Sequence, residues 1–124
     1  MNCPKCNCRM EPVKFQDVEV DRCTHCKGLW FDAGEHDALK KLAGSEKIDV
    51  GRAAVGRTYD KLQKANCPRC NVEMRSIPVP CQQHITMDNC PTCGGVFMDA
   101  GEFKDFKDEG LWDFLQQFLH KGKP

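Results

Sequence analysis

Apolar and polar residues alternate over residues 12–23, a pattern that predicts two short β-strands joined by a turn. The polar pair Gln16–Asp17 interrupts the alternation and marks the turn. An unbroken apolar triplet, Leu29–Phe31, follows a few residues later and predicts a third strand. The same pattern returns in the second half of the chain and ends in the triplet Val96–Met98. The chain is therefore expected to form two small three-stranded units.

Each apolar triplet runs into the tetrapeptide Asp-Ala-Gly-Glu, which is typical of a helix start. It occurs as Asp32–Glu35 and again as Asp99–Glu102. The pattern is close to a capping box, in which the aspartate side chain accepts from the N3 amide and the glutamate reaches back to the cap amide. Leu39 and Leu42 then share one helix face, and Gly44 predicts the end of the first helix. A short helix is thus expected after each set of strands.

The C-terminal residues 110–124 carry a wide apolar stripe at helical spacing, which predicts an amphipathic helix. The residues of this stripe that are candidates for contact with a partner are Leu111, Trp112, Leu115 and Phe118. One interpretation is that the helix packs within the chain. The alternative is that it fills a groove on a partner protein or pairs with a second copy to form a homodimer.

Residues 45–65 form a linker that contains the one notable basic cluster. The helical spacing of Val55, Tyr59 and Leu62 predicts a helix over residues 57–65. The basic residues of the cluster are Arg52, Arg57, Lys61 and Lys64. They are candidates for contact with nucleic-acid phosphates. The alternative is a solvated linker with no role in binding.

The two halves of the chain form an internal repeat. Residues 2–13 match residues 66–77 at an offset of 64, and "CTHCKGLWFDAGE" at 23–35 matches "CPTCGGVFMDAGE" at 90–102 at an offset of 67. The three extra residues of the second copy fall between Pro78 and His84, which predicts a hairpin tip, because loops absorb insertions more readily than strands. The expected organisation is a first unit over 1–44, the linker over 45–65, a second unit over 66–109 and the C-terminal helix over 110–124.

Ten cysteines in 124 residues are the main compositional signal. Each copy reads Cys-x2-Cys, then 16 or 19 residues, then Cys-x2-Cys, a spacing that suits four thiolates around one tetrahedral Zn²⁺. The predicted ligands are Cys3, Cys6, Cys23 and Cys26 in the first copy and Cys67, Cys70, Cys90 and Cys93 in the second. Units this short bury too little apolar surface to fold without a staple. The predicted fold class is a small metal-stabilised α+β protein with two zinc ions per chain.

The residue after the second cysteine of each pair is expected to have a positive φ. Each Cys-x2-Cys pair predicts a tight turn whose N–H groups point at sulfur, and such a turn favours a residue that tolerates the left-handed region. Asn7, Asn71 and Gly94 fit this requirement. Lys27 does not, and Gly28 is expected to adopt the turn in its place.

Two cysteines fall outside the repeated pattern. Cys8 matches Val72, and Cys81 lies in the inserted segment, so neither is expected to bind metal. Both are interpreted as ordinary free thiols, with a redox role as the alternative. A closed site of four thiolates leaves no position for a reactive water, and no nucleophile with a base is evident. The carboxylates beside the cysteines are therefore interpreted as helix caps rather than acid–base catalysts, and the chain is not expected to be an enzyme.

The phrases "CPKC…DRCTHCKGLWFDAGE" and "CPRC…DNCPTCGGVFMDAGE" resemble the transcription factor IIB-type zinc-finger domain, in two tandem copies. The resemblance implies a zinc ribbon in each copy, with the eight cysteines named above as ligands. It also implies contact with nucleic acid or with the transcription apparatus.

The charge balance bears on the kind of partner. Lysine plus arginine and aspartate plus glutamate both number 18, and thiolates bound to zinc add further negative charge. A chain that is not basic is a weak candidate for general nucleic-acid binding. The hypothesis is therefore a zinc-binding module in transcription or gene expression, with the choice between a protein and a nucleic-acid partner open.

The sequence leaves other functions open and also bears on the location of the protein. One alternative is a protein–protein adaptor or homo-oligomer without a nucleic-acid role. Rubredoxin-like electron transfer through iron–thiolate sites is a second, because two Cys-x2-Cys pairs also suit one iron. A dithiol oxidoreductase is a third alternative, but this sequence lacks the βαβ pattern that surrounds a Cys-x-x-Cys pair in such enzymes. There is no N-terminal apolar stretch and no run of about 18 apolar residues, so the expected location is the cytoplasm, without a membrane span.

Overall fold

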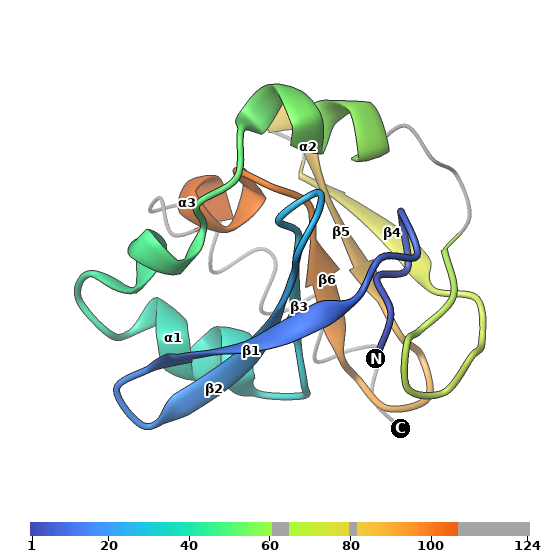
Figure 1. Ribbon diagram of the computed structural model, residues 1–124. Helices are drawn as coiled ribbons and strands as arrows, with labels where there is room; N and C mark the ends of the chain where they lie inside the picture. The colour runs from blue at the N-terminus through green and yellow to red at the C-terminus, as the bar shows by residue number, and fades with distance from the viewer. Residues whose placement is uncertain (61–64, 80–81, 107–124) are drawn as a thin grey trace.

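A computed structural model describes residues 1–60, 65–79 and 82–106 of the chain (Figure 1). The strands are β1 (Met10–Phe15), β2 (Val18–Cys23), β3 (Leu29–Phe31), β4 (Arg75–Val79), β5 (Gln82–Asn89) and β6 (Val96–Met98). The helices are α1 (Glu35–Lys40), the 3₁₀-helix η1 (Ser45–Ile48), α2 (Ala53–Asp60) and α3 (Glu102–Phe106). None of the helices in the described ranges is long and apolar enough to cross a membrane.

The six strands form one antiparallel sheet in the order β1-β2-β3-β6-β5-β4. Each repeat contributes three strands, and the repeats join where β3 pairs with β6, as Figure 1 shows at the centre of the sheet. In this pair Trp30 lies opposite Phe97, and these two residues are equivalent in the internal repeat. The register therefore places a pseudo-twofold axis between Trp30 and Phe97, and the two ribbons share one sheet.

The first hairpin follows the predicted alternation. Strands β1 and β2 pair from Met10 opposite Cys23 to Phe15 opposite Val18, and Gln16 in the connecting turn has φ 53°. In the second copy the inserted residues fall where β4 and β5 connect, and the pairing register shifts between Pro78 and Val79. An insertion at this end of the hairpin leaves the paired strands beside the cysteines undisturbed.

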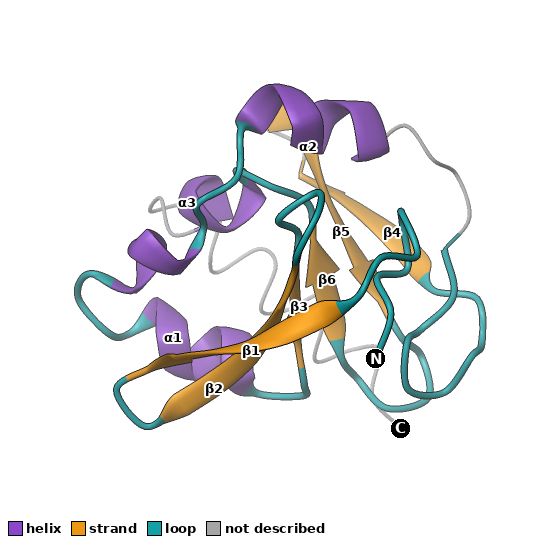
Figure 2. Cartoon of the chain, in the orientation of Figure 1, coloured by secondary structure: helices purple, strands orange, loops and turns teal. Residues whose placement is uncertain are grey.

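The two faces of the sheet carry different cores, because neighbouring side chains of a strand point to opposite faces. One face packs against α1 and α3 and buries ten apolar side chains: Val20, Leu29, Phe31, Leu39, Ile48, Ile77, Met87, Val96, Met98 and Phe103 (Figure 2). The other face buries Trp30 and Phe97 together with cysteines of both repeats. The sheet thus separates a core that includes α1 and α3 from a second core of cysteines, Trp30 and Phe97, against which Val55 of α2 packs.

Of the two hydrogen bonds of the predicted capping box at α1, the structure has the one made by the glutamate and lacks the one made by the aspartate. The glutamate behaves as expected, since Glu35 Oε1 accepts from the Asp32 N–H at 2.8 Å. Glu102 Oε1 likewise accepts from the Asp99 N–H at 2.8 Å. The prediction for Asp32 is wrong, because the N-cap of α1 is Gly34, with φ 89° and no side-chain cap. The aspartate side chain binds elsewhere, as described below.

The linker is not a solvated connection over residues 45–49, where Ser45, Ile48 and Asp49 are buried. Asp49 accepts from the Gly101 N–H at 2.8 Å and from the Lys104 N–H at 3.1 Å, so its carboxylate caps the first turn of α3. Burial raises the pKa of Asp49, and these amides oppose the shift. The predicted linker helix also begins earlier than expected, at Ala53 rather than residue 57.

Candidate metal centres

The eight predicted ligands form two clusters of four cysteines. In each cluster the Sγ atoms all lie within 4.8 Å of one another. The first two cysteines of a cluster precede the first strand of their repeat, and the other two lie at the turn between its second and third strands. The clusters are Cys3, Cys6, Cys23 and Cys26, and Cys67, Cys70, Cys90 and Cys93.

The spacing of the sulfur atoms fits a tetrahedral metal site. The Sγ atoms of Cys3 and Cys26 are 3.7 Å apart, and those of Cys6 and Cys23 are 3.3 Å apart. In the second cluster Cys67 and Cys93 are separated by 3.8 Å. A tetrahedron with Zn–S bonds of about 2.3 Å has edges of about 3.8 Å, so both clusters can close around one ion.

Backbone amides surround the sulfur atoms, as the predicted turns require. Cys23 Sγ accepts from the N–H groups of His25 and Cys26 at 3.3 and 3.4 Å. Cys90 Sγ accepts in the same way from Thr92 and Cys93, both at 3.4 Å. These donors stabilise thiolate, the form of cysteine that binds metal.

The residue after each second cysteine has a positive φ. The values are 64° at Asn7, 56° at Asn71 and 78° at Gly94, which confirms the prediction for these three turns. The prediction for the remaining turn is wrong, because Lys27 itself takes the left-handed conformation with φ 66°. Gly28 has a different role, since a Cβ at that position would overlap the Phe97 ring.

The thiols influence one another within each cluster. The neighbouring Cys26 thiol lowers the pKa of Cys3 to about 5, and the Cys3 thiolate raises the pKa of Cys26. Burial raises the pKa of Cys23 and of Cys67. Four thiolates that are buried or half-buried and lie within 4.8 Å of one another require a cation, and Zn²⁺ binding deprotonates a coordinating thiol outright.

Each cluster is also linked to the other repeat by a basic side chain. Lys5, between Cys3 and Cys6, places Nζ 3.2 Å from Asp88 and 3.1 Å from Asp99 of the second copy. All three side chains are almost fully buried, and the two aspartates together raise the pKa of Lys5 against the opposing effect of burial.

The reciprocal contact lies at the other cluster. Arg69, between Cys67 and Cys70, donates from Nη2 to Asp32 Oδ2 at 2.8 Å, and its Nε also binds Asp32. Arg69 lies 3.9 Å from Asp21 as well, and Trp30 Nε1 donates to Asp32 at 3.0 Å. We did not predict these contacts from the sequence. The available signal was that the basic residue and both aspartates recur in the two copies.

The remaining candidate residues are placed as follows. Arg52 is exposed in the segment before α2, and Arg57 lies on α2. Cys8 is half-buried near the first cluster but does not belong to its group of four. Lys61, Lys64, Cys81, Leu111, Trp112, Leu115 and Phe118 lie outside the described residues. Contacts of the linker with phosphate and of the C-terminal stripe with a partner stay predictions.

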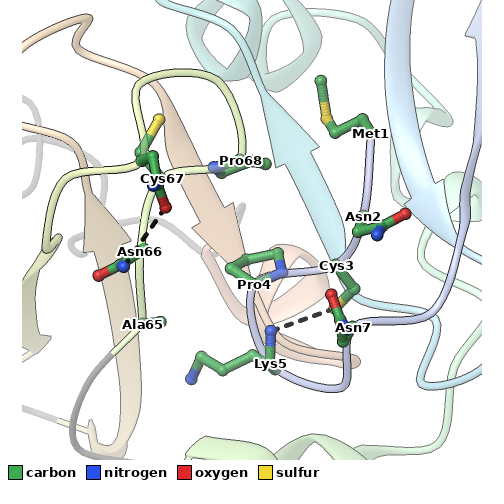
Figure 3. A pocket seen from close by; sticks show the side chains of 11 residues that line it. Met1, Asn2, Cys3, Pro4, Lys5, Asn7, Ala65, Asn66, Cys67 and Pro68 are labelled. Carbon is green, nitrogen blue, oxygen red and sulfur yellow. Dashed lines mark hydrogen bonds between the residues drawn. The ribbon is translucent and has the colours of Figure 1, made fainter.

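A cleft of about 740 Å³ lies between the first Cys-x2-Cys turns of the two repeats. Its lining includes residues that are equivalent in the two repeats, among them Asn2 and Asn66, Pro4 and Pro68, and Asn7 and Asn71. Figure 3 shows the segment with Asn2 and Pro4 facing the segment with Asn66 and Pro68. The four asparagines are exposed, so the cleft presents uncharged carboxamides.

Comparison with known proteins agrees with this geometry. Neither curated proteins nor solved structures give a significant match. A family model described as transcription factor zinc-finger matches residues 2–42 and 66–109, which together span most of the chain. Each matched segment contains one cluster of four cysteines with tetrahedral spacing. The chain therefore belongs to the transcription factor IIB-type zinc-finger family, with two tandem copies and two Zn²⁺ sites per chain.

Proposed function

We propose that this protein is a non-enzymatic binding module that docks on a protein partner in transcription or gene expression. The observation that carries the proposal is the pair of closed four-cysteine sites in a chain of the transcription factor zinc-finger family. A zinc ion with four thiolates has no open position for substrate or water. The metal then serves the fold, and the function lies on the surface that the fold presents.

The charges around the metal sites favour a protein partner over nucleic acid. Lys5 and Arg69 are the basic residues of the two Cys-Pro-basic-Cys turns, and both bind carboxylates of the opposite repeat. A phosphate group would have to displace these carboxylates. The overall charge balance is zero, so long-range attraction to a polyanion is weak.

The cleft between the first turns is the candidate docking surface. Its exposed carboxamides, at Asn2, Asn7, Asn66 and Asn71, can both donate and accept hydrogen bonds. Pro4 and Pro68 add apolar surface on the two sides. An extended peptide offers the matching backbone N–H and C=O groups. Among the described lining residues the one lysine, Lys5, is buried and bound to Asp88 and Asp99.

The test is affinity capture of the full chain from native cell lysate, with and without nuclease. The variant Asn2→Arg with Asn66→Arg places two bulky cations in the cleft, and Thr58→Arg on the exposed side of α2 is the matched control. We expect a protein that survives nuclease treatment, that binds the control, and that is lost with the cleft variant.

Two results would contradict the proposal. Capture that disappears after nuclease treatment would point to nucleic acid, and a titration with oligonucleotide at two salt concentrations would then show binding that strengthens at low salt. Capture that is equal for the cleft variant and the control would remove the cleft as the docking surface.

A further inference from the structure

We propose that the two zinc sites bind their ions cooperatively, because the first Cys-x2-Cys turn of each site is held by an ion pair to the strand that carries the second Cys-x2-Cys pair of the other site. The proposal concerns communication between the sites and is independent of which partner the protein binds.

The stronger link starts from the first site. Lys5 belongs to the turn formed by Cys3 and Cys6, and its Nζ lies 3.2 Å from Asp88 Oδ2 and 3.1 Å from Asp99 Oδ2. Asp88 is near the end of β5, two residues before Cys90 of the second site. The turn that holds the first ion is thus attached directly to the strand that delivers a ligand to the second ion.

The second link has the same form in the opposite direction. Arg69 belongs to the turn formed by Cys67 and Cys70, and it reaches Asp32 and Asp21 of the first repeat. Asp21 lies on β2, two residues before Cys23 of the first site. Both sites therefore present a basic residue to the other repeat and receive one from it.

Metal binding can act through these links because it orders the turns. Without an ion, four thiols have no common ligand to hold them, and the free energy of zinc binding in small domains is largely free energy of folding. An ion at the first site fixes the Cys3–Cys6 turn, and with it Lys5, against Asp88 and Asp99. The strand β5 is then already in place when the second ion binds, so the second ion binds more tightly. By thermodynamic linkage, an ion at the second site must increase the affinity of the first site by the same factor.

The two links differ in strength. The Lys5 side chain is 1% exposed and its partners 6% and 1%, so their charges are little screened and breaking the contact would leave buried carboxylates without their cation. The Arg69 side chain is 47% exposed and Asp32 39%, and exposed pairs contribute little. Most of the coupling is therefore assigned to Lys5.

The experiment follows metal loading of the full chain. Metal-free protein is titrated with Co²⁺ in a metal buffer, and native mass spectrometry counts chains with zero, one and two ions. Equal, independent sites would leave about half of the chains with one ion at half-saturation, whereas a coupling of about 25-fold leaves about one chain in six. A one-ion population of half or more would overturn the proposal.

Variants locate the coupling. Lys5→Met and Asp99→Asn should each raise the one-ion population, with two ions still bound at saturation. Because Asp99 is one of the two partners of Lys5, the double variant should resemble Lys5→Met alone, and Asp99→Asn alone should have the smaller effect, since Asp88 still binds Lys5. Lys27→Met is the matched control, since it removes a positive charge beside Cys26 in the same site while keeping the Lys5 ion pair.

These variants also separate cross-repeat coupling from a local effect of charge. Equal changes in Lys27→Met and Lys5→Met, with none in Asp99→Asn, would overturn the proposal. If Lys5→Met does not fold, as judged by circular dichroism, Asp99→Asn alone decides, because it weakens the same buried ion pair and keeps the size of the side chain. A rise in the one-ion population of that variant would support the coupling, and an unchanged population would contradict it.

Discussion

Trp30 and Phe97 lie opposite each other in the central strand pair, and the ring of each contacts a glycine of the other repeat. A Cβ at Gly28 would overlap the Phe97 ring, and a Cβ at Gly95 would overlap the Trp30 ring. Gly28 and Gly95 are equivalent in the two copies, as are the two aromatic residues. The glycine two residues after each second cysteine pair is therefore required by packing between the repeats.

Replacing Gly28 with alanine tests this packing. We expect Gly28→Ala to lower the free energy of unfolding by about 1–3 kcal/mol, because overfilling a tight core forces rings and backbone to shift. The measurement is denaturant unfolding in excess zinc. The same substitution made in a Phe97→Leu background is the control, and its penalty should be smaller there because the smaller side chain leaves room. An equal penalty in both backgrounds would show that the ring is not the cause.

The assignment of metal ligands predicts different behaviour for two neighbouring cysteines. Cys23→Ser should leave one tightly bound zinc ion per chain, because the first site loses one of its four thiolates. Cys8→Ser should keep both ions, since Cys8 is not in either group of four. Elemental analysis after dialysis gives the zinc content. Loss of an ion in Cys8→Ser would mean that Cys8 takes part in the first site.

Removing the metal is expected to unfold both ribbons. A strong chelator should abolish the near-ultraviolet circular dichroism of Trp30, which is fully buried on the sulfur face of the sheet. The physical reason is that uncompensated thiolates repel one another and that the apolar core alone is small. Adding Zn²⁺ back should restore the signal. A chain that keeps its signal without metal would refute a structural role for zinc.

The linker cap predicts a cost for Asp49→Ala. The substitution removes the acceptor of two amides at the start of α3 and should lower the free energy of unfolding by about 0.5–2 kcal/mol, as for other lost helix caps. Asp17→Ala in the exposed turn between β1 and β2 is the matched control and should have little effect. Equal effects of the two substitutions would mean that Asp49 stabilises the fold in some other way.

Local features of the fold were predictable because their causes lie within a few residues. Alternation gave the β1–β2 hairpin, and the cysteine spacing gave both clusters. The tolerance of asparagine and glycine for positive φ gave the turns at Asn7, Asn71 and Gly94. The back-bond of Glu35 also follows from a spacing of three residues.

Two misses are local, the positive φ of Lys27 and the start of α2 at Ala53, and the others join distant parts of the chain. Lys5 and Asp99 are 94 positions apart, and nothing near either residue indicates that they meet. Asp32 was assigned to the helix because a cap is the local use of such a residue, whereas the structure gives its carboxylate to Arg69. The burial of Asp49 is likewise set by α3, about fifty residues later.

The pairing of β3 with β6 between the repeats affects the solubility expected of a single ribbon. Strands β3 and β6 are apolar and fully buried, and each is the last strand of its own ribbon. A ribbon without its partner would present Leu29, Trp30 and Phe31 on an unpaired edge, the arrangement that recruits strands of other molecules and leads to aggregation. The outer edges of the joined sheet instead carry prolines, Pro12 on β1 and Pro78 on β4, which cannot donate to a further strand. Because both repeats lie in one chain, the aggregation-prone edges β3 and β6 pair with each other and become the interior of the sheet.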